Sequence, residues 1–160
     1  MFDQFIHNGP SWAVQMGFVW SLVMATILGA IMGLERSLAG KHAGMRTYAL
    51  VALGSCLFVV VGTLASFEMS FFSGLNPLQI ASSVVIGIGF IGSGLAALHG
   101  GNPVELTTAS GLWVAAAVGM ACGFGLYVIA IATVVVSVVI LSLFSRVEHR
   151  LRVRYGVKAN

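Results

Sequence analysis

Long apolar runs separated by short polar breaks fill almost the whole chain. The five runs are residues 13–33, 47–67, 79–98, 105–123 and 126–144. Each holds about 20 residues, which is enough for an α-helix to cross a hydrocarbon core of roughly 30 Å. The pattern therefore predicts an all-α polytopic membrane protein with five transmembrane helices.

The last two runs raise the question of whether residues 105–144 form one helix or two. A single helix of that length would extend about 60 Å, twice the thickness of the bilayer core. Gly119, Gly123 and Gly125 lie where a break is needed, and glycine weakens a helix. The sequence predicts two spans joined by a tight turn.

Basic residues are concentrated in two of the polar segments. Three of the eight Lys and Arg residues lie in the loop at 34–46, and five follow Phe144. The segment before Trp12 has no base, and the connection at 68–78 has one acid and no base. Because cytoplasmic loops carry an excess of Lys and Arg, we expect the N-terminus outside and the C-terminus in the cytoplasm.

The same charges divide the chain into a transmembrane domain, residues 1–145, and a basic cytoplasmic tail, residues 146–160. The tail is expected to continue the fifth helix, and its positive charge favours anionic lipid head groups. A docking helix for a partner protein is the alternative. The first run is predicted to be a retained helix, because the segment before it lacks the positive charges of a signal peptide.

Composition narrows the class further. The chain is 58% hydrophobic and only 8% charged, whereas a soluble domain has about 25% charged residues. It holds no Ser/His/Asp set, no H-E-x-x-H motif and no nucleic-acid motif, so we expect neither an enzyme nor a nucleic-acid-binding protein, and no cofactor. Cys56 and Cys122 fall inside apolar runs, where buried inert thiols are expected.

The ionisable residues nearest to membrane depth are expected to form one polar layer on the cytoplasmic side. The layer combines the ends of the first two spans with the start of the fourth: Glu35, Arg36, Gly44, Arg46, Thr47, Glu105, Thr107 and Thr108. In one interpretation Glu35 pairs with Arg46 or Arg36 as a topology anchor. Glu105 and Thr107 then cap the fourth helix, with the acid matching the helix dipole.

The alternative interpretation of this layer is a polar site for an ion or a partner. Mg²⁺ prefers carboxylate and water oxygens, so Glu35 and Glu105 are the candidate metal ligands. Two arginines in the same layer argue against a cation there. No residue is predicted to be catalytic.

Small residues recur in four-residue steps within the spans and make smooth faces for close helix packing. Those predicted to pack helices are Gly29, Gly33, Gly87, Gly89, Gly92, Gly111, Ala115 and Gly119. Residues 87–92 also match the dinucleotide fingerprint G-x-G-x-x-G, but they lie in the middle of an apolar run without the strand and the acid that such a site needs. The stripes also suggest self-association, unless packing within one protomer uses them.

A series of motifs runs in order along most of the chain. The motifs are Glu35-Arg36, Gly40-Lys41, Ala43-Gly44-Met45-Arg46-Thr47, Leu50-Val51-Ala52-Leu53-Gly54, and residues 87–94, 106–109 and 112–119. This series resembles the MgtC/SapB family of bacterial inner-membrane proteins. The resemblance implies a protein linked to growth at low magnesium and to survival inside host macrophages, without established enzymatic activity. Some members are thought to restrain the ATP synthase, and others were once proposed as magnesium transporters.

Four positions depart from the family's pattern. Asn76 and Gln79 stand where an Asp before the proline and an Arg after it are usual. Ser83 replaces a common Gln, and Glu105 stands where Gly is usual. If the missing Asp and Arg carry a family function, this chain has a different task.

The leading hypothesis is a non-enzymatic regulator linked to magnesium homeostasis. It would act by contact with another membrane protein, with the ATP synthase as one candidate, or with a second copy of itself. The partner surface would be a lipid-facing helix, with the glycine stripe of the fourth span as the candidate. The alternative is a transporter or channel for Mg²⁺ or another cation. The regulator is favoured because an ion path would be expected to need a carboxylate in the middle of a span.

Overall fold

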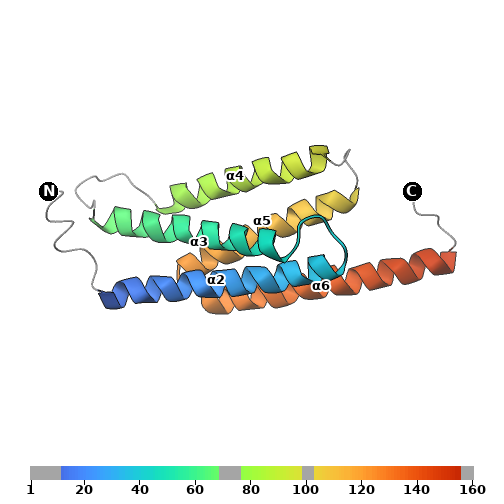
Figure 1. Cartoon of the computed structure of the whole chain (residues 1–160), viewed down its shortest axis with the longest axis horizontal. Helices are drawn as coiled ribbons and strands as arrows, with labels where there is room; N and C mark the ends of the chain where they lie inside the picture. The colour runs from blue at the N-terminus through green and yellow to red at the C-terminus, as the bar shows by residue number, and fades with distance from the viewer. Residues whose placement is uncertain (1–11, 69–76, 99–102, 156–160) are drawn as a thin grey trace.

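The computed structural model describes residues 12–68, 77–98 and 103–155. All regular structure in these ranges is helical: α2 (Trp12–Leu38), α3 (Met45–Glu68), α4 (Pro77–Leu98), α5 (Pro103–Gly123) and α6 (Tyr127–Tyr155). Each helix is long and apolar enough to cross a membrane. The prediction of an all-α protein with five spans is confirmed (Figure 1).

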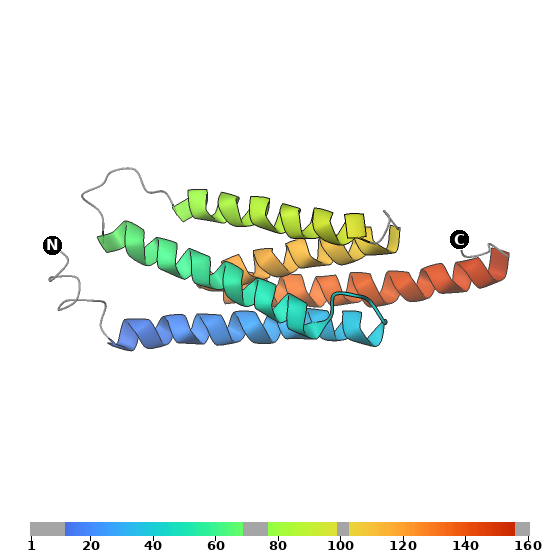
Figure 2. The same ribbon diagram turned by 45° about the horizontal axis from the view of Figure 1, so that its top comes forward.

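The helices form a bundle with α5 at its centre (Figures 1 and 2). α5 packs against each of the other four helices, whereas α4 lies at the edge and, among the described helices, touches only α3 and α5. α2 begins and α6 ends at opposite ends of the bundle, as an odd number of spans requires. Which of these ends faces the cytoplasm stays a prediction.

α2 continues beyond the start of the loop that was predicted at 34–46. The N–H groups of Gly40 and Lys41 donate to the carbonyls of Ser37 and Arg36, at 3.1 and 3.0 Å. Gly40 has a φ of +66°, which glycine adopts without strain at a helix end. Glu35 and Arg36 therefore lie in the last turns of α2 and not in a loop. Glu and Arg have a high helix propensity, so the helix continues past them and ends only at Gly40.

The tight turn predicted between the last two spans is present. Gly125 has a φ of +75°. The N–H groups of Gly125 and Leu126 donate to the carbonyls of Cys122 and Ala121, at 3.0 and 2.8 Å. The same pattern of backbone hydrogen bonds, with a glycine at positive φ, ends α2. Here it reverses the direction of the chain within three residues.

α6 is a single helix from this turn to Tyr155, as expected for a tail that continues the fifth span. Its start is tied to α2 by a hydrogen bond between the hydroxyls of Ser21 and Tyr127, which are 2.7 Å apart. Its other end extends beyond the other helices (Figures 1 and 2).

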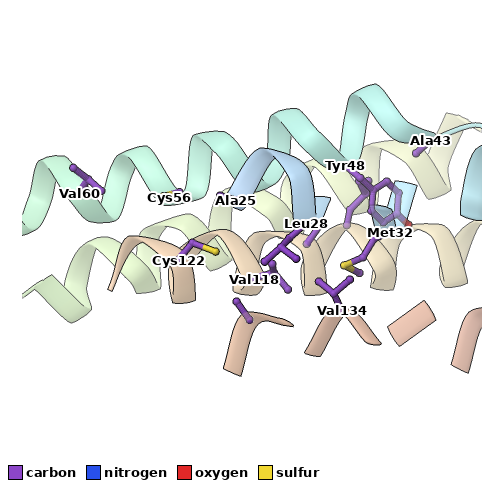
Figure 3. Packing of buried hydrophobic residues seen from close by; sticks show 13 residues of the cluster. Ala25, Leu28, Met32, Ala43, Tyr48, Cys56, Val60, Val118, Cys122 and Val134 are labelled. Atoms are coloured by element: carbon purple, nitrogen blue, oxygen red, sulfur yellow. The ribbon is translucent and has the colours of Figure 1, made fainter. Parts of the chain in front are cut away.

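Small and medium-sized side chains fill the core of the bundle. Figure 3 shows the buried cluster, which includes Ala25, Met32, Tyr48, Cys56, Val118, Cys122 and Val134. Cys56 and Cys122 are buried free thiols, as predicted. The outside carries large apolar side chains, such as Phe90 at 80% exposure and Val128 at 82%. Such a surface suits contact with lipid.

Candidate functional site at the loop end

One end of the bundle brings together the end of α2, the start of α3 and the start of α5 (Figure 1). We call it the loop end. A Cβ added to Gly33 would lie 2.6 Å from the Met45 Cα, and one added to Gly29 would lie 2.7 Å from the Tyr48 carbonyl oxygen. Only glycine fits at these distances, so both residues let α2 and α3 meet backbone to backbone.

α5 meets α3 in the same way. A Cβ on Gly119 would overlap the carbonyl oxygen of Ala52 and lie 2.8 Å from the carbonyl carbon. A Cβ on Gly111 would overlap the hydroxyl of Tyr48, and Ala115 is fully buried between the two glycines. The glycine stripe of α5 is therefore inside the bundle. This corrects the expectation that it forms a lipid-facing surface for a partner.

The glycines of α4 have the opposite environment. Gly87 and Gly89 are exposed, and nothing lies within 4 Å of a Cβ added to either. At Gly92 the nearest atom is the Cβ of Ala109, at an ordinary contact distance of 3.4 Å. The close packing expected at Gly87 and Gly89 is not made within one copy of the chain, because α4 lies at the edge of the bundle.

Tyr48 joins α3 to the start of α5. Its side chain is fully buried, and its hydroxyl donates a hydrogen bond of 3.1 Å to the carbonyl oxygen of Thr108. Gly111 provides the space for the ring. Tyr48 is not among the residues that the sequence predicted for the polar layer, although a tyrosine close to Arg46 and Thr47 at the start of an apolar run is a signal for a buried polar contact.

Removing the Tyr48 hydroxyl tests this contact. Tyr48→Phe is expected to lower the free energy of unfolding by about 1 kcal/mol, because the buried carbonyl loses a donor. An SDS titration of the purified protein, followed by circular dichroism, measures the change. Tyr155→Phe is the matched control, since Tyr155 is 74% exposed. Equal stability of the two variants would show that the bond does not join the helices.

Glu35 and Arg36 form the ion pair of the loop end. The Nε of Arg36 donates to Oε2 of Glu35 at 2.5 Å, and their side chains are 3% and 16% exposed, respectively. Of the two partners considered for Glu35, the structure thus selects Arg36. Arg46 is exposed and has no ion pair with a described acid.

The other residues of the predicted polar layer have different surroundings. A Cβ on Gly44 would overlap the hydroxyl of Ser37, which also accepts a hydrogen bond of 2.9 Å from the Met45 N–H. Thr108 is fully buried, whereas Thr47 is half-buried and Thr107 is exposed.

The predicted metal ligands are not both described. Glu105 belongs to α5, but its side chain lies outside the described residues, as does Asn76. Among the described residues there is no group of three His, Cys, Asp or Glu side chains that could hold a metal ion. The magnesium site at Glu35 and Glu105 therefore stays a prediction.

A groove of about 340 Å³ separates α3 from α4. It is lined by Val51, Ser55, Phe58, Ile80, Ser83, Val84, Gly87, Ile88 and Ile91. Ser55 is only 3% exposed, and its hydroxyl has no hydrogen-bond partner among the described residues. By contrast, Ser83 on the facing helix donates to the carbonyl one turn earlier, at 3.0 Å. The groove thus holds a buried hydroxyl, that of Ser55, without a partner in the part of the chain that the structure describes, a feature that the sequence did not reveal.

The comparisons with known proteins decide the family. The sequence model of the MgtC family matches residues 22–150. This chain belongs to the MgtC family. A protein of Escherichia coli K12 named putative magnesium transporter YhiD is 39% identical over 136 residues, which cover 84% of this chain and 63% of that protein. Protein SrpB of Synechococcus elongatus is 37% identical over 83% of this chain and 78% of its own length.

Proteins named MgtC are also similar. The protein of Brucella abortus is 43% identical over 105 residues, which cover 66% of this chain but only 42% of the relative. This chain spans less than two thirds of both the E. coli and the Brucella relatives. No solved structure matches the chain. Its five apolar helices and its family make it a multi-pass membrane protein of bacteria.

Proposed function

We propose that this chain is a non-enzymatic regulator in the bacterial inner membrane, linked to magnesium homeostasis and to adaptation to low magnesium. It acts through helix contacts with another membrane protein, and the family resemblance makes the ATP synthase one candidate. The magnesium link is supported by membership of the MgtC family. The mode of action is supported by the free surface of α4.

α4 uses little of its surface inside the bundle. Only 6% of its spanning window is buried, against 33% for α2 and α3 and 44% for α5. Its exposed glycines and serines are Ser82, Ser83, Gly87, Gly89, Ser93 and Gly94. Helices in lipid associate through small residues, because their backbones can then approach closely. An unused face of this kind favours contact with a further transmembrane helix.

The groove beside α4 supports the same interpretation. A hydroxyl that is buried in an apolar environment without a partner costs free energy. Ser55 is such a group, and it lines the groove that Gly87 borders. A helix that enters this groove would offer the Ser55 hydroxyl a partner and would cover the exposed backbone of Gly87.

The alternative function is transport of Mg²⁺ or another cation. It is favoured by the printed name of the E. coli relative, putative magnesium transporter. The buried polar residues of the described bundle argue against it, because they are Ser21, Arg36, Ser55 and Thr108. An ion path through a span would be expected to include a carboxylate.

Crosslinking from α4 tests the proposed regulator. A photocrosslinking amino acid at Ile86, which is 74% exposed on α4, should capture one membrane protein in native membranes. Adding Gly87→Leu and Gly89→Leu is expected to lower that yield about fivefold, which corresponds to about 1 kcal/mol of lost contact. The fold should tolerate both changes, because no described residue lies within 4 Å of a Cβ added at either position. Mass spectrometry of the crosslinked product identifies and quantifies the partner.

The control replaces an exposed glycine on another helix. On α2, a Cβ added to Gly17 also has no described neighbour within 4 Å, so Gly17→Leu should leave the yield unchanged. An unchanged yield with Gly87→Leu and Gly89→Leu would exclude α4 as the contact surface. Rapid Mg²⁺ uptake by vesicles that contain only the purified protein would favour the transporter instead.

A further inference from the structure

The groove between α3 and α4 is closed at one end and reaches the middle of the membrane span. A Cβ added to Gly62 of α3 would overlap the side chain of Ile80, so the two helices touch there. From this contact α3 and α4 run in opposite directions (Figures 1 and 2). Ser55 and Gly87 both line the groove, and each is seven residues from the contact, so they lie at the same depth. Gly87 is also close to the middle of the apolar span Leu78–Leu95.

Ser55 indicates that the groove is a contact site which a single copy leaves incomplete. Its side chain is almost fully buried and has no hydrogen bond to a described residue. Ser66 on the same helix instead donates to the carbonyl of Gly62 at 2.7 Å, as helical serines often do. The groove has a volume of about 340 Å³, whereas an apolar cavity of about 150 Å³ already takes up a benzene ring. It therefore has room for an aromatic side chain.

α4 exposes such a side chain next to the groove. Phe90 is the most exposed large apolar residue of α4, at 80%. It lies about 60° from Gly87 around the helix axis. Val84 and Ile91, which line the groove, lie about 40–60° from Gly87 on the other side. Because side chains tilt toward the N-terminus of their helix, the ring of Phe90 reaches back to the depth of Gly87.

This arrangement is self-complementary. Two copies in one membrane have the same orientation, because the same charges set it, so each residue meets its equivalent at equal depth. A two-fold axis along the membrane normal places one side of Gly87 against the other side in the second copy. Each Phe90 then enters the groove of the other copy, and the two glycines let the helices approach closely. α4 contains no charged residue, so the paired helices do not repel each other.

We infer that two copies of this chain associate through α4, with Phe90 of each copy in the α3–α4 groove of the other. A different protein would need a protruding side chain and a small residue at matching depths, whereas a second copy supplies both. Because this names the helix that enters the groove, it rests on the proposed function. Ser82, Gly89 and Ser93 lie about 120–160° from Gly87 and stay free for another membrane protein.

Disulfide crosslinking between two differently tagged copies tests the geometry. One copy carries Phe90→Cys, and the other carries Val51→Cys on the wall of the groove. Oxidation with copper phenanthroline in native membranes should join the two tags at least tenfold more than when Val128→Cys replaces Phe90→Cys. Val128 is equally exposed, at 82%, but lies on α6. Cys56 and Cys122 are fully buried, and copies without added cysteines give the background.

Association of the purified protein in lipid vesicles tests the role of the ring. Donor and acceptor dyes on Leu38→Cys, which is exposed at the end of α2, report pairing by energy transfer. Phe90→Ala should weaken pairing about tenfold, whereas Val128→Ala should leave it within twofold of wild type. Both side chains are exposed in a single copy, so neither change should disturb its fold.

The outcomes separate this inference from the proposed function. Crosslinking of Phe90→Cys no stronger than that of Val128→Cys would overturn the inference, as would equal pairing of the two alanine variants. If the copies stay apart while a crosslinker at Ile86 captures another membrane protein, the inference fails and the proposed function stands. If Ile86 captures only a second copy and Phe90→Ala weakens pairing, the inference stands and the proposed regulator lacks its partner.

Discussion

Replacing Glu35 by glutamine is expected to lower the free energy of unfolding by roughly 3–5 kcal/mol. The change removes the carboxylate that lies 2.5 Å from the Nε of Arg36. It leaves a guanidinium, on a side chain that is 3% exposed, without a counter-charge among the described residues. An SDS titration followed by circular dichroism measures the loss in the purified protein.

Two further variants test whether the loss of stability comes from the unpaired charge of Arg36 or from the loss of any polar side chain at this end. Glu35→Gln combined with Arg36→Met removes both charges and should recover most of the stability, because no buried charge remains unpaired. Arg46→Gln removes an exposed cation from the same end and should stay within about 0.5 kcal/mol of wild type. If Glu35→Gln proved as stable as Arg46→Gln, the pair would have no structural role.

Replacing Gly119 by valine is expected to destabilise the fold by about 3 kcal/mol. The new side chain would overlap the carbonyl oxygen of Ala52, which is backbone and cannot turn aside. α3 and α5 would have to separate along the contact that forms the centre of the bundle. The same SDS titration measures the effect.

The matched substitution is Gly89→Val on α4. A Cβ at this position has no described neighbour within 4 Å, and a side chain suits a helix interior better than glycine does. We expect it to stay within about 0.5 kcal/mol of wild type. An equal loss at Gly89 and Gly119 would show that helix propensity, and not the contact between α3 and α5, determines the cost.

The number of helices could be predicted from the sequence, but not where they end. A span must hold about 20 apolar residues, so five runs predict five helices. The ends depend on backbone hydrogen bonds that hydropathy does not report. α2 stops where Gly40 takes a positive φ, several residues after the first charge. A reading of Gly40 as a helix stop would have placed Glu35 inside the helix.

The stripes of small residues illustrate a second limit. The same pattern predicted close packing on α4 and on α5, yet Gly111 and Gly119 of α5 are in close contact with α3, while Gly87 of α4 is open. A small residue permits a close approach without specifying which helix makes it. That choice depends on which helix occupies the centre of the bundle, and only the fold determines this.

The polar contacts could be predicted only in part. The sequence identified Glu35 and left Arg36 and Arg46 open as its partners, and the structure pairs it with Arg36. The bond from Tyr48 to α5 and the burial of the Ser55 hydroxyl beside the groove were missed. Both side chains lie within apolar runs, where one hydroxyl hardly changes the hydropathy, and their burial depends on the helix across from them.

The central position of α5 has a consequence for biosynthesis. The ribosome releases the chain from its N-terminus, so α2, α3 and α4 leave the translocon before α5, against which all three pack. Until α5 arrives, the Tyr48 hydroxyl has no Thr108 carbonyl to bond, and the Ala52 carbonyl has no glycine beside it. Nascent chains that are arrested before Pro103 should therefore hold an α2–α3 hairpin that is closely packed at Gly29 and Gly33 but lacks its cover by α5, which chaperones or proteases of the membrane can recognise as unfinished.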